Sequence, residues 1–214
     1  MKKSDRYDVS ALSDAQFEPG SDGQVLKNRL GIRSPKAMDD AEALALERVM
    51  GELVRKYDEK HCFTAADICA LHKAWLGGIY AWAGIYRQVN ISKDGFPFAA
   101  AARVPVLMAQ FERDVLQRHT PCNFEDRPDV IRALAETHAE LILIHPFREG
   151  NGRVARVLST LMALQAGLPL LDFGRIAGEE KEAYFAAVRA GLDRNYKPME
   201  RLFAEIIERS LAAS

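Results

Sequence analysis

The sequence predicts an all-α domain that carries one small β-hairpin. Apolar residues recur at helical spacing through most of the chain, and a single segment near the middle alternates instead. The chain has 214 residues, which is the length of one domain and enough to bury a core without disulfides. We expect residues 1–24, which are polar and contain glycine, to be a mobile N-terminal arm and residues 25–214 to be the single domain.

Seven apolar stripes predict the helices of this domain. Thr64 and Asp67 form a capping-box pattern at the start of the second stripe, and Gly77–Gly78 is expected to end it. Pro198 fits the first turn of the last helix. The stripes cover residues 39–57, 64–76, 104–115, 129–144, 154–165, 184–192 and 198–207.

The segment from residue 86 to residue 98 has a different pattern. Val89 and Ile91 alternate with polar neighbours, and Lys93-Asp94-Gly95 is a good turn, so a short hairpin is expected here. Because an isolated hairpin is only marginally stable, it must lie against the helices. A plain connecting loop is the alternative.

Composition excludes several classes of protein. The formal net charge of −1 gives no electrostatic footprint for nucleic acid or a membrane surface. The three cysteines are odd in number and lack CxxC spacing, which favours incidental thiols in a reduced compartment. No signal peptide and no stretch of about 18–20 apolar residues is present. We therefore expect a cytoplasmic protein with no direct nucleic-acid or membrane partner.

The segment HPFREGNGR, from His145 to Arg153, is the most informative part of the chain. Pro146 cannot continue the preceding helix comfortably and biases His145 towards an extended conformation. Gly150-Asn151-Gly152 lies where a loop becomes a helix N-terminus. Backbone N–H groups there can converge on an anion, supported by the positive end of the helix dipole.

The charged residues of this segment fit a bound polyphosphate. Arg153 and Arg156 share one helix face near the N-terminus, where each cation is disfavoured by roughly 0.3–1 kcal/mol unless an anion binds. Glu149 would repel that anion unless a hard cation such as Mg²⁺ bridges the two. His145 is the one group of the segment whose unperturbed pKa lies near neutrality, which suits a general base. Each residue alone could have an ordinary structural role as a cap, a core residue or an ion-pair partner. The whole set together indicates a functional site.

The stretch HPFREGNGRVAR, residues 145–156, resembles the Fic-family signature HPFx(D/E)GNGRxxR at every specified position. GSDGQVLKNRLGI, residues 20–32, is similar to the N-terminal segment of short bacterial Fic proteins. YRQVNISKDGFPFA, residues 86–99, is similar to the family's target-docking flap. The resemblance implies a Fic fold, a compact helical domain with a small β-hairpin flap over the active site.

The resemblance also implies an activity, which is transfer of AMP from ATP to a Tyr, Thr or Ser hydroxyl of a target protein with release of pyrophosphate. Lys93 and Phe96 would belong to the target-docking flap. Tyr184 and Asn195 are candidate contacts of the adenine, with a core or capping role as the favoured alternative for each. The motif residues would divide the chemistry as follows: His145 is the base, Glu149 positions Mg²⁺, Gly150, Asn151 and Gly152 form an anion hole, and Arg153 and Arg156 hold the β- and γ-phosphates.

Regulation and partners follow from the same resemblance. Many Fic proteins carry an inhibitory helix with Ser or Thr, three residues, Glu, and then Gly or Asn, whose Glu pairs with the second arginine. No such string occurs at either end of this sequence, so we expect Arg156 to be unobstructed. The chain would then resemble the toxin of a toxin–antitoxin pair, restrained by a small separate antitoxin. Type II topoisomerase subunits are the targets that this likeness suggests.

Three other functions stay open at the level of sequence. Doc-like relatives transfer the γ-phosphoryl group, but they carry a lysine where this chain has Gly152. Transfer of UMP, GMP or phosphocholine by the same site is compatible with the motif. A non-catalytic nucleotide-binding module is the alternative from another class, although it would have no need of His145.

Overall fold

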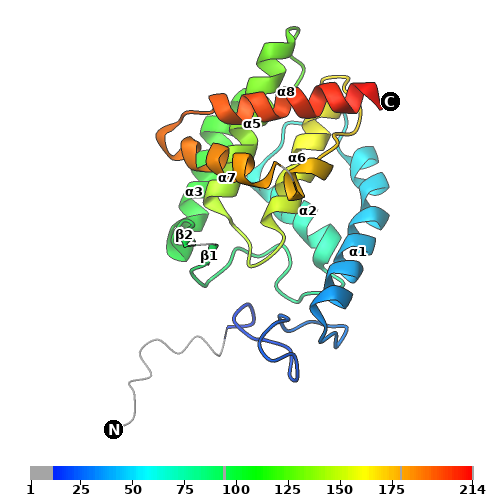
Figure 1. Cartoon of the computed structure of the whole chain (residues 1–214), viewed down its shortest axis with the longest axis vertical. Helices are drawn as coiled ribbons and strands as arrows, with labels where there is room; N and C mark the ends of the chain where they lie inside the picture. The colour runs from blue at the N-terminus through cyan, green and yellow to red at the C-terminus, as the bar shows by residue number, and fades with distance from the viewer. Residues whose placement is uncertain (1–11, 94, 179, 214) are drawn as a thin grey trace.

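Two buried helices, α5 (Arg127–Ile144) and α6 (Asn151–Gln165), form the centre of the structure. The computed structural model describes residues 12–93, 95–178 and 180–213. Helix α8 lies across one end of α5, and α7 packs on both of them (Figure 1). The remaining elements are α1 (Pro35–Lys56), α2 (Ala65–Leu76), β1 (Ser92–Lys93), β2 (Phe96–Pro97), η2 (Ala101–Arg103), α3 (Val104–Phe111), η3 (Glu112–Leu116), α4 (Gln117–His119), η4 (Gly174–Ala177), α7 (Lys181–Ala190), η5 (Gly191–Asp193) and α8 (Lys197–Ala212).

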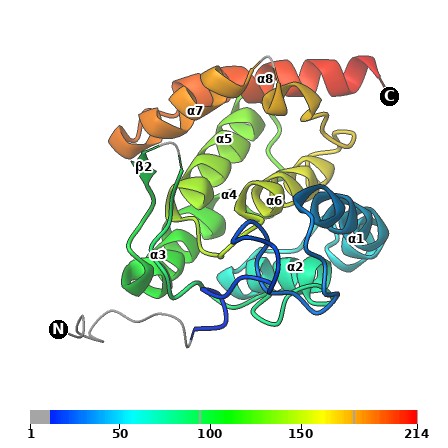
Figure 2. The same cartoon turned by 60° about the horizontal axis from the view of Figure 1, so that its bottom comes forward.

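Helix α2 packs against α6, and α1 covers α2 from outside (Figure 2). Helix α2 begins at the expected capping box: the Thr64 hydroxyl accepts a hydrogen bond from the Asp67 N–H, and the Asp67 carboxylate accepts one from the Thr64 N–H. Gly77 ends the helix as predicted. This arrangement places the buried side chains of His72 and Trp75 beside the start of α6.

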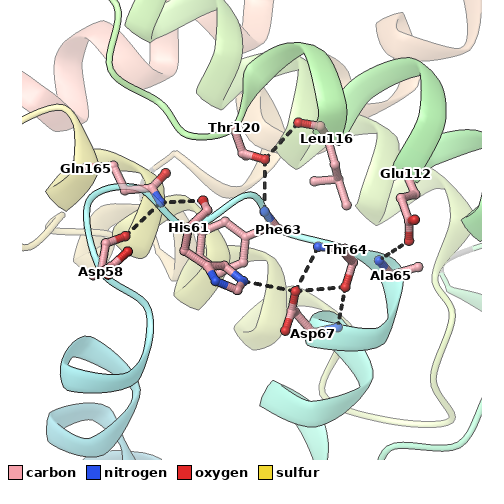
Figure 3. A network of polar contacts seen from close by, with 10 residues as sticks. All are labelled: Asp58, His61, Phe63, Thr64, Ala65, Asp67, Glu112, Leu116, Thr120 and Gln165. Atoms are coloured by element: carbon pink, nitrogen blue, oxygen red, sulfur yellow. Dashed lines mark hydrogen bonds and ion pairs between the residues drawn. The ribbon is translucent and has the colours of Figure 1, made fainter.

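The connection between α1 and α2 is held by polar contacts from three other elements (Figure 3). At the end of α6, the Gln165 amide donates to the carbonyls of Asp58 and His61 at 3.1 and 2.8 Å. The Thr120 hydroxyl accepts from the Phe63 N–H at 3.0 Å, and the Glu112 carboxylate accepts from Ala65 at 2.7 Å. These bonds fix α2 relative to the central helices.

The helix predicted over residues 104–115 is interrupted. Helix α3 ends at Phe111, and residues Glu112–Leu116 form a π-helical turn before α4. The turn brings the Glu112 carboxylate to the N-terminus of α2, where a negative charge complements the helix dipole. Apolar periodicity does not register such a change in hydrogen bonding, because Val115 and Leu116 stay buried through it.

The hairpin is present but shorter than the sequence indicates. Its two antiparallel strands pair Ser92 with Pro97 and Lys93 with Phe96, so the alternating Val89 and Ile91 lie outside the strands. The carbonyl of Val89 instead accepts a hydrogen bond from the Arg87 side chain at 2.8 Å. The chain is thus a mostly helical protein with one small hairpin, which confirms the predicted fold class.

The predicted N-terminal arm falls partly outside the described residues, which begin at residue 12. In the described part, Phe17 forms a β-bridge with Leu26, and the Asp14 carboxylate accepts a hydrogen bond from the Gln88 N–H at 2.9 Å. Mobility of the arm and its boundary at residue 24 stay predictions. Among the described residues, no helix is both long and apolar enough to cross a membrane.

Candidate active site

The motif loop, residues 145–150, connects α5 to α6 and is closed by one side chain. The Asn151 amide donates to the carbonyl of Phe147 and accepts from its N–H, both at 2.8 Å. Phe147 is fully buried and anchors the loop in the core. The Asn151 side chain is therefore committed to fixing the shape of the loop.

His145 is not extended, contrary to the sequence prediction. Its backbone is left-handed, with φ 52° and ψ 61°, and its N–H donates to the Leu141 carbonyl at 3.0 Å as the cap of α5. Pro146 disfavours the right-handed helical region for the residue before it, and a left-handed residue satisfies that restriction while ending the helix.

The His145 ring is held in the tautomer that a general base requires. Its Nδ1 lies 2.9 Å from the carbonyl oxygen of Ile142, which can only accept, so in the neutral ring Nδ1 carries the proton and Nε2 is unprotonated. Among the described residues Nε2 has no hydrogen-bond partner. The ring of Phe98 stacks on it with centroids 3.6 Å apart. Burial lowers the pKa of His145 to about 4, with the nearby Arg87 and Lys93 charges acting in the same direction. His145 is therefore neutral at neutral pH.

The two glycines of the motif, Gly150 and Gly152, have different roles. Gly150 has a φ of +82°, and a Cβ there would lie 2.7 Å from Cζ3 of Trp75, so both conformation and space require glycine. Gly152 is in the first turn of α6, and a Cβ there would have no heavy atom within 4 Å. Gly152 thus leaves open space beside the helix N-terminus.

Arg153 and Arg156 are held differently although they share a helix face. Arg153 pairs with the buried Glu42 carboxylate of α1, and its guanidinium lies 4.7 Å from the centroid of the Trp75 ring. Arg156 donates to the Gly152 carbonyl at 3.2 Å, and within the described parts of the chain it has no ion pair. Burial lowers the pKa of Arg156, with Arg153 adding to the effect. Two cations held this close to a helix N-terminus suit a polyanion.

One cavity of about 670 Å³ brings together the motif residues predicted for the chemistry and the two predicted flap residues. Its other walls come from the hairpin and from α7. Lys93 reaches across with its Nζ 5.2 Å from the centroid of the Phe185 ring, and Phe96 contacts Phe98 edge to face. Tyr184 lines the cavity, and Asn195 does not. The Asn195 N–H donates to the Ala190 carbonyl at the end of α7, which is the capping role that the sequence also allowed. The predicted residues on the wall are Lys93, Phe96, His145, Glu149, Gly150, Asn151, Gly152, Arg153 and Arg156.

Glu149 is the motif carboxylate on the wall of this cavity, which Glu182 of α7 also lines. Its side chain is 49% exposed, and Oε1 accepts from the Gly150 N–H at 2.9 Å. The described residues contain no cluster of three or more metal-ligating side chains. A single carboxylate beside a phosphate site fits Mg²⁺, which takes one or two protein carboxylates and completes its shell with phosphate oxygens and water.

Comparison with known proteins gives the family. The Fic/DOC family matches residues 62–163, which include the hairpin, the motif loop and both arginines. The chain belongs to the Fic/DOC family. It is 26% identical over 192 residues to the protein adenylyltransferase Fic of Drosophila melanogaster, and 26% identical over 199 residues to the probable protein adenylyltransferase Fic of Escherichia coli strain K12. The match covers 92% of the Escherichia coli protein but 37% of the Drosophila protein, so the chain spans about a third of the curated fly relatives.

Solved structures share the Fic fold. The BepC effector of Bartonella tribocorum, crystallised with AMPPNP, has a TM-score of 0.71 at 20% identity, covering 92% of this chain and 97% of that one. The Fic domain of a Bartonella quintana effector with bound ADP has a TM-score of 0.72 at 24% identity, covering 91% and 95%. These similarities confirm the predicted fold.

Sequence reasoning missed Arg87, which joins the motif loop of this Fic domain to its hairpin. Its guanidinium is buried and donates to the His145 carbonyl at 2.7 Å, to Val89 at 2.8 Å and to Ala99, and its N–H donates to Pro146. One cation thus binds the C-terminal end of α5 and both legs of the hairpin, as a cation near a helix C-terminus should. The available signal was a single arginine at the end of the aromatic segment 80–86.

His72 is a second missed residue, and it supports the loop from beneath. The Gly84 N–H can only donate, so Nδ1 of His72 is the acceptor at 2.8 Å, and Nε2–H donates to the Glu149 carbonyl at 3.0 Å. Its ring stacks on Phe147 with centroids 3.9 Å apart. Burial lowers the pKa of His72 to about 4. A neutral histidine therefore fixes the backbone of Glu149.

Replacing Arg87 by lysine should loosen the loop and the hairpin together. A single ammonium cannot reach carbonyls on both hairpin legs and on α5, so we expect the free energy of unfolding to fall by roughly 2–4 kcal/mol. Urea unfolding measures the loss, and hydrogen exchange should show faster opening at residues 87–99. Arg103→Lys, on an exposed arginine, is the matched control; equal stability of the two variants would contradict the role given to Arg87.

The two motif glycines, Gly150 and Gly152, should respond differently to alanine. Gly150→Ala meets both a left-handed backbone and the Trp75 ring, and should lower the free energy of unfolding by roughly 2–4 kcal/mol. Gly152→Ala enters open space in a helix and should change it by less than about 1 kcal/mol. Thermal and urea unfolding of both variants test this contrast, and a Gly152→Ala loss as large as that of Gly150→Ala would refute it.

Proposed function

We propose that the chain is a protein adenylyltransferase, which transfers AMP from ATP to a Tyr, Thr or Ser hydroxyl of a target protein and releases pyrophosphate. The observation that carries the proposal is that the free Nε2 of His145 shares one cavity with Arg153 and Arg156 at the N-terminus of α6. The names of the relatives and the AMPPNP and ADP bound in the related structures support the same reaction class.

In this proposal His145 removes the proton from the target hydroxyl. The oxygen attacks the α-phosphorus of ATP, and the bond from that phosphorus to the oxygen bridging the α- and β-phosphates breaks. The electron pair leaves with pyrophosphate, and Nε2 keeps the proton until solvent takes it. Arg153, Arg156 and the α6 dipole stabilise the charge that builds on the leaving group. The protein's contribution is therefore positioning and charge stabilisation.

Glu149 would hold Mg²⁺ in this site. The ion supplies charge neutralisation at the phosphates when it is bound. The Glu149 backbone is fixed by His72, while its exposed carboxylate stays on the cavity wall. Holding the backbone in place limits the positions that the carboxylate can reach, which is the requirement for an ion shared between protein and nucleotide.

The hairpin would hold the target segment. An extended segment can add to the edge of a strand through main-chain hydrogen bonds, and the hairpin lies on the wall of the cavity that contains His145. Lys93 and Phe96 are the side chains that would meet it. Because Arg87 ties the hairpin legs to His145, a segment bound there arrives at a set distance from the base.

A separate inhibitory partner belongs to the same proposal. In the described residues Arg156 has no carboxylate partner, so a small antitoxin could supply one in trans. The chain would then act as the toxin of a pair in the cytoplasm, and type II topoisomerase subunits are the proposed targets. Co-purification with a small acidic partner that suppresses activity tests this part.

Labelling from two positions of ATP tests the reaction. The wild-type chain, Mg²⁺ and a bacterial lysate are incubated with α-³²P-ATP or γ-³²P-ATP. His145→Ala is tested in parallel, with the control His61→Ala, which removes an imidazole that is not on the cavity wall. We expect a protein band labelled from the α-position only, lost in His145→Ala and retained in His61→Ala. Loss of at least about a hundredfold is expected for removal of a general base.

The other outcomes identify the alternatives. Label from the γ-position only would show phosphoryl transfer and overturn adenylyl transfer. Equal labelling by His145→Ala and wild type would exclude His145 as the base. Absence of label from either position, with nucleotide binding retained, would favour another donor or a non-catalytic binding module.

A further inference from the structure

Glu42 is a buried carboxylate in the middle of α1, outside the residues that match the Fic/DOC family. The residue is 2% exposed, and a buried charge is costly unless it is paired and hydrogen-bonded. Both carboxylate oxygens have partners: the Tyr80 hydroxyl donates to Oε1 at 2.7 Å, and Arg153 donates to Oε2. Burial and the bond to Glu42 raise the pKa of Tyr80, so Tyr80 remains a donor.

The backbone of Glu42 also positions Trp75, and Arg153 lies over the Trp75 ring. The backbone carbonyl of Glu42 accepts from Nε1 of Trp75 at 2.8 Å, and the Arg153 guanidinium lies over the Trp75 ring. Arg153 is thus held at one edge by the carboxylate and on one face by the indole. Trp75 in turn packs where a side chain on Gly150 would be, so the ring is also a wall of the motif loop.

Without Glu42 the nearest anion for Arg153 is Glu149. The Glu149 Oε1 lies 3.8 Å from the same guanidinium nitrogen, Nη2, that now pairs with Glu42. An Arg153 released by Glu42 would turn to Glu149 and occupy the carboxylate that the site offers to a cation. Glu42 is not on the cavity wall, so it has no direct contact with a bound nucleotide.

We propose that Glu42 is a positioning residue that orients Arg153 towards the terminal phosphates of the nucleotide. This inference rests on the proposed function, because it assumes a polyphosphate in the cavity. Glu42 pairs with Nη2 and leaves the other guanidinium N–H groups for phosphate oxygens. Because the guanidinium is planar and rigid, fixing Nη2 also fixes the directions of those N–H groups. Helix α1 thereby completes a site whose sequence signature lies entirely on the later part of the chain.

The test compares two nucleotides that differ in the terminal phosphates. Binding of AMPPNP and of AMP, each with Mg²⁺, is measured by calorimetry for wild type, Glu42→Gln and the control Glu47→Gln, which is an exposed acid on the same helix. We expect Glu42→Gln to weaken AMPPNP binding by about tenfold or more, since an oriented charged hydrogen bond is lost, and to change AMP binding by less than about twofold. Glu47→Gln should change neither.

Two further variants separate positioning from stability. In an Arg153→Ala background Glu42→Gln should have no additional effect on AMPPNP binding, because Glu42 acts through Arg153. Tyr80→Phe removes only one hydrogen bond from the carboxylate and should give a smaller loss with the same preference for AMPPNP, which keeps the test valid if Glu42→Gln folds poorly.

The contrary outcomes are distinct. Equal loss of AMP and AMPPNP binding, or an undiminished effect of Glu42→Gln in the Arg153→Ala background, would overturn the positioning role and leave the proposed function intact. Failure of the wild-type chain to bind either nucleotide would overturn the proposed nucleotide site together with this inference.

Discussion

The buried guanidinium of Arg87 is the interaction on which the active-site geometry most depends. It binds the carbonyl of His145, which caps α5, and at the same time one carbonyl on each leg of the hairpin. The left-handed backbone of His145, the position of its ring and the position of the hairpin are therefore set by one side chain. The proposed reaction brings a target hydroxyl to His145, and it would need such a fixed relation between the hairpin and that ring.

Two neutral histidines, His72 and His145, also support the loop. His145 donates from Nδ1 to the helix it ends, His72 donates to the Glu149 carbonyl, and each has its pKa lowered to about 4 by burial. Neutral rings can accept as well as donate, which charged side chains such as lysine cannot do. These two histidines therefore add no positive charge to that of Arg153 and Arg156, which line the cavity.

Local patterns in the sequence were enough to predict the helices and the set of motif residues. The capping box at Thr64 and the motif from His145 to Arg156 involve residues a few positions apart, and helical spacing fixes their relation. The supporting residues could not be found in this way. Arg87 acts 58 positions from His145, and Glu42 acts 111 positions from Arg153, so their partners are set by packing between helices. The short strands and the π-helical turn were missed because apolar patterns report burial and not hydrogen bonding.

The central claim is that His145 is a neutral ring whose Nε2 is unprotonated. Nitrogen NMR of the ring tests that claim most directly. Spectra of the ¹⁵N-histidine-labelled chain are recorded from about pH 5 to pH 8, with His145→Ala to assign the signal. The structure predicts a neutral ring protonated on Nδ1 throughout, since its pKa is lowered to about 4. A titration midpoint near the ordinary value of about 6.5, or a proton on Nε2, would contradict the account.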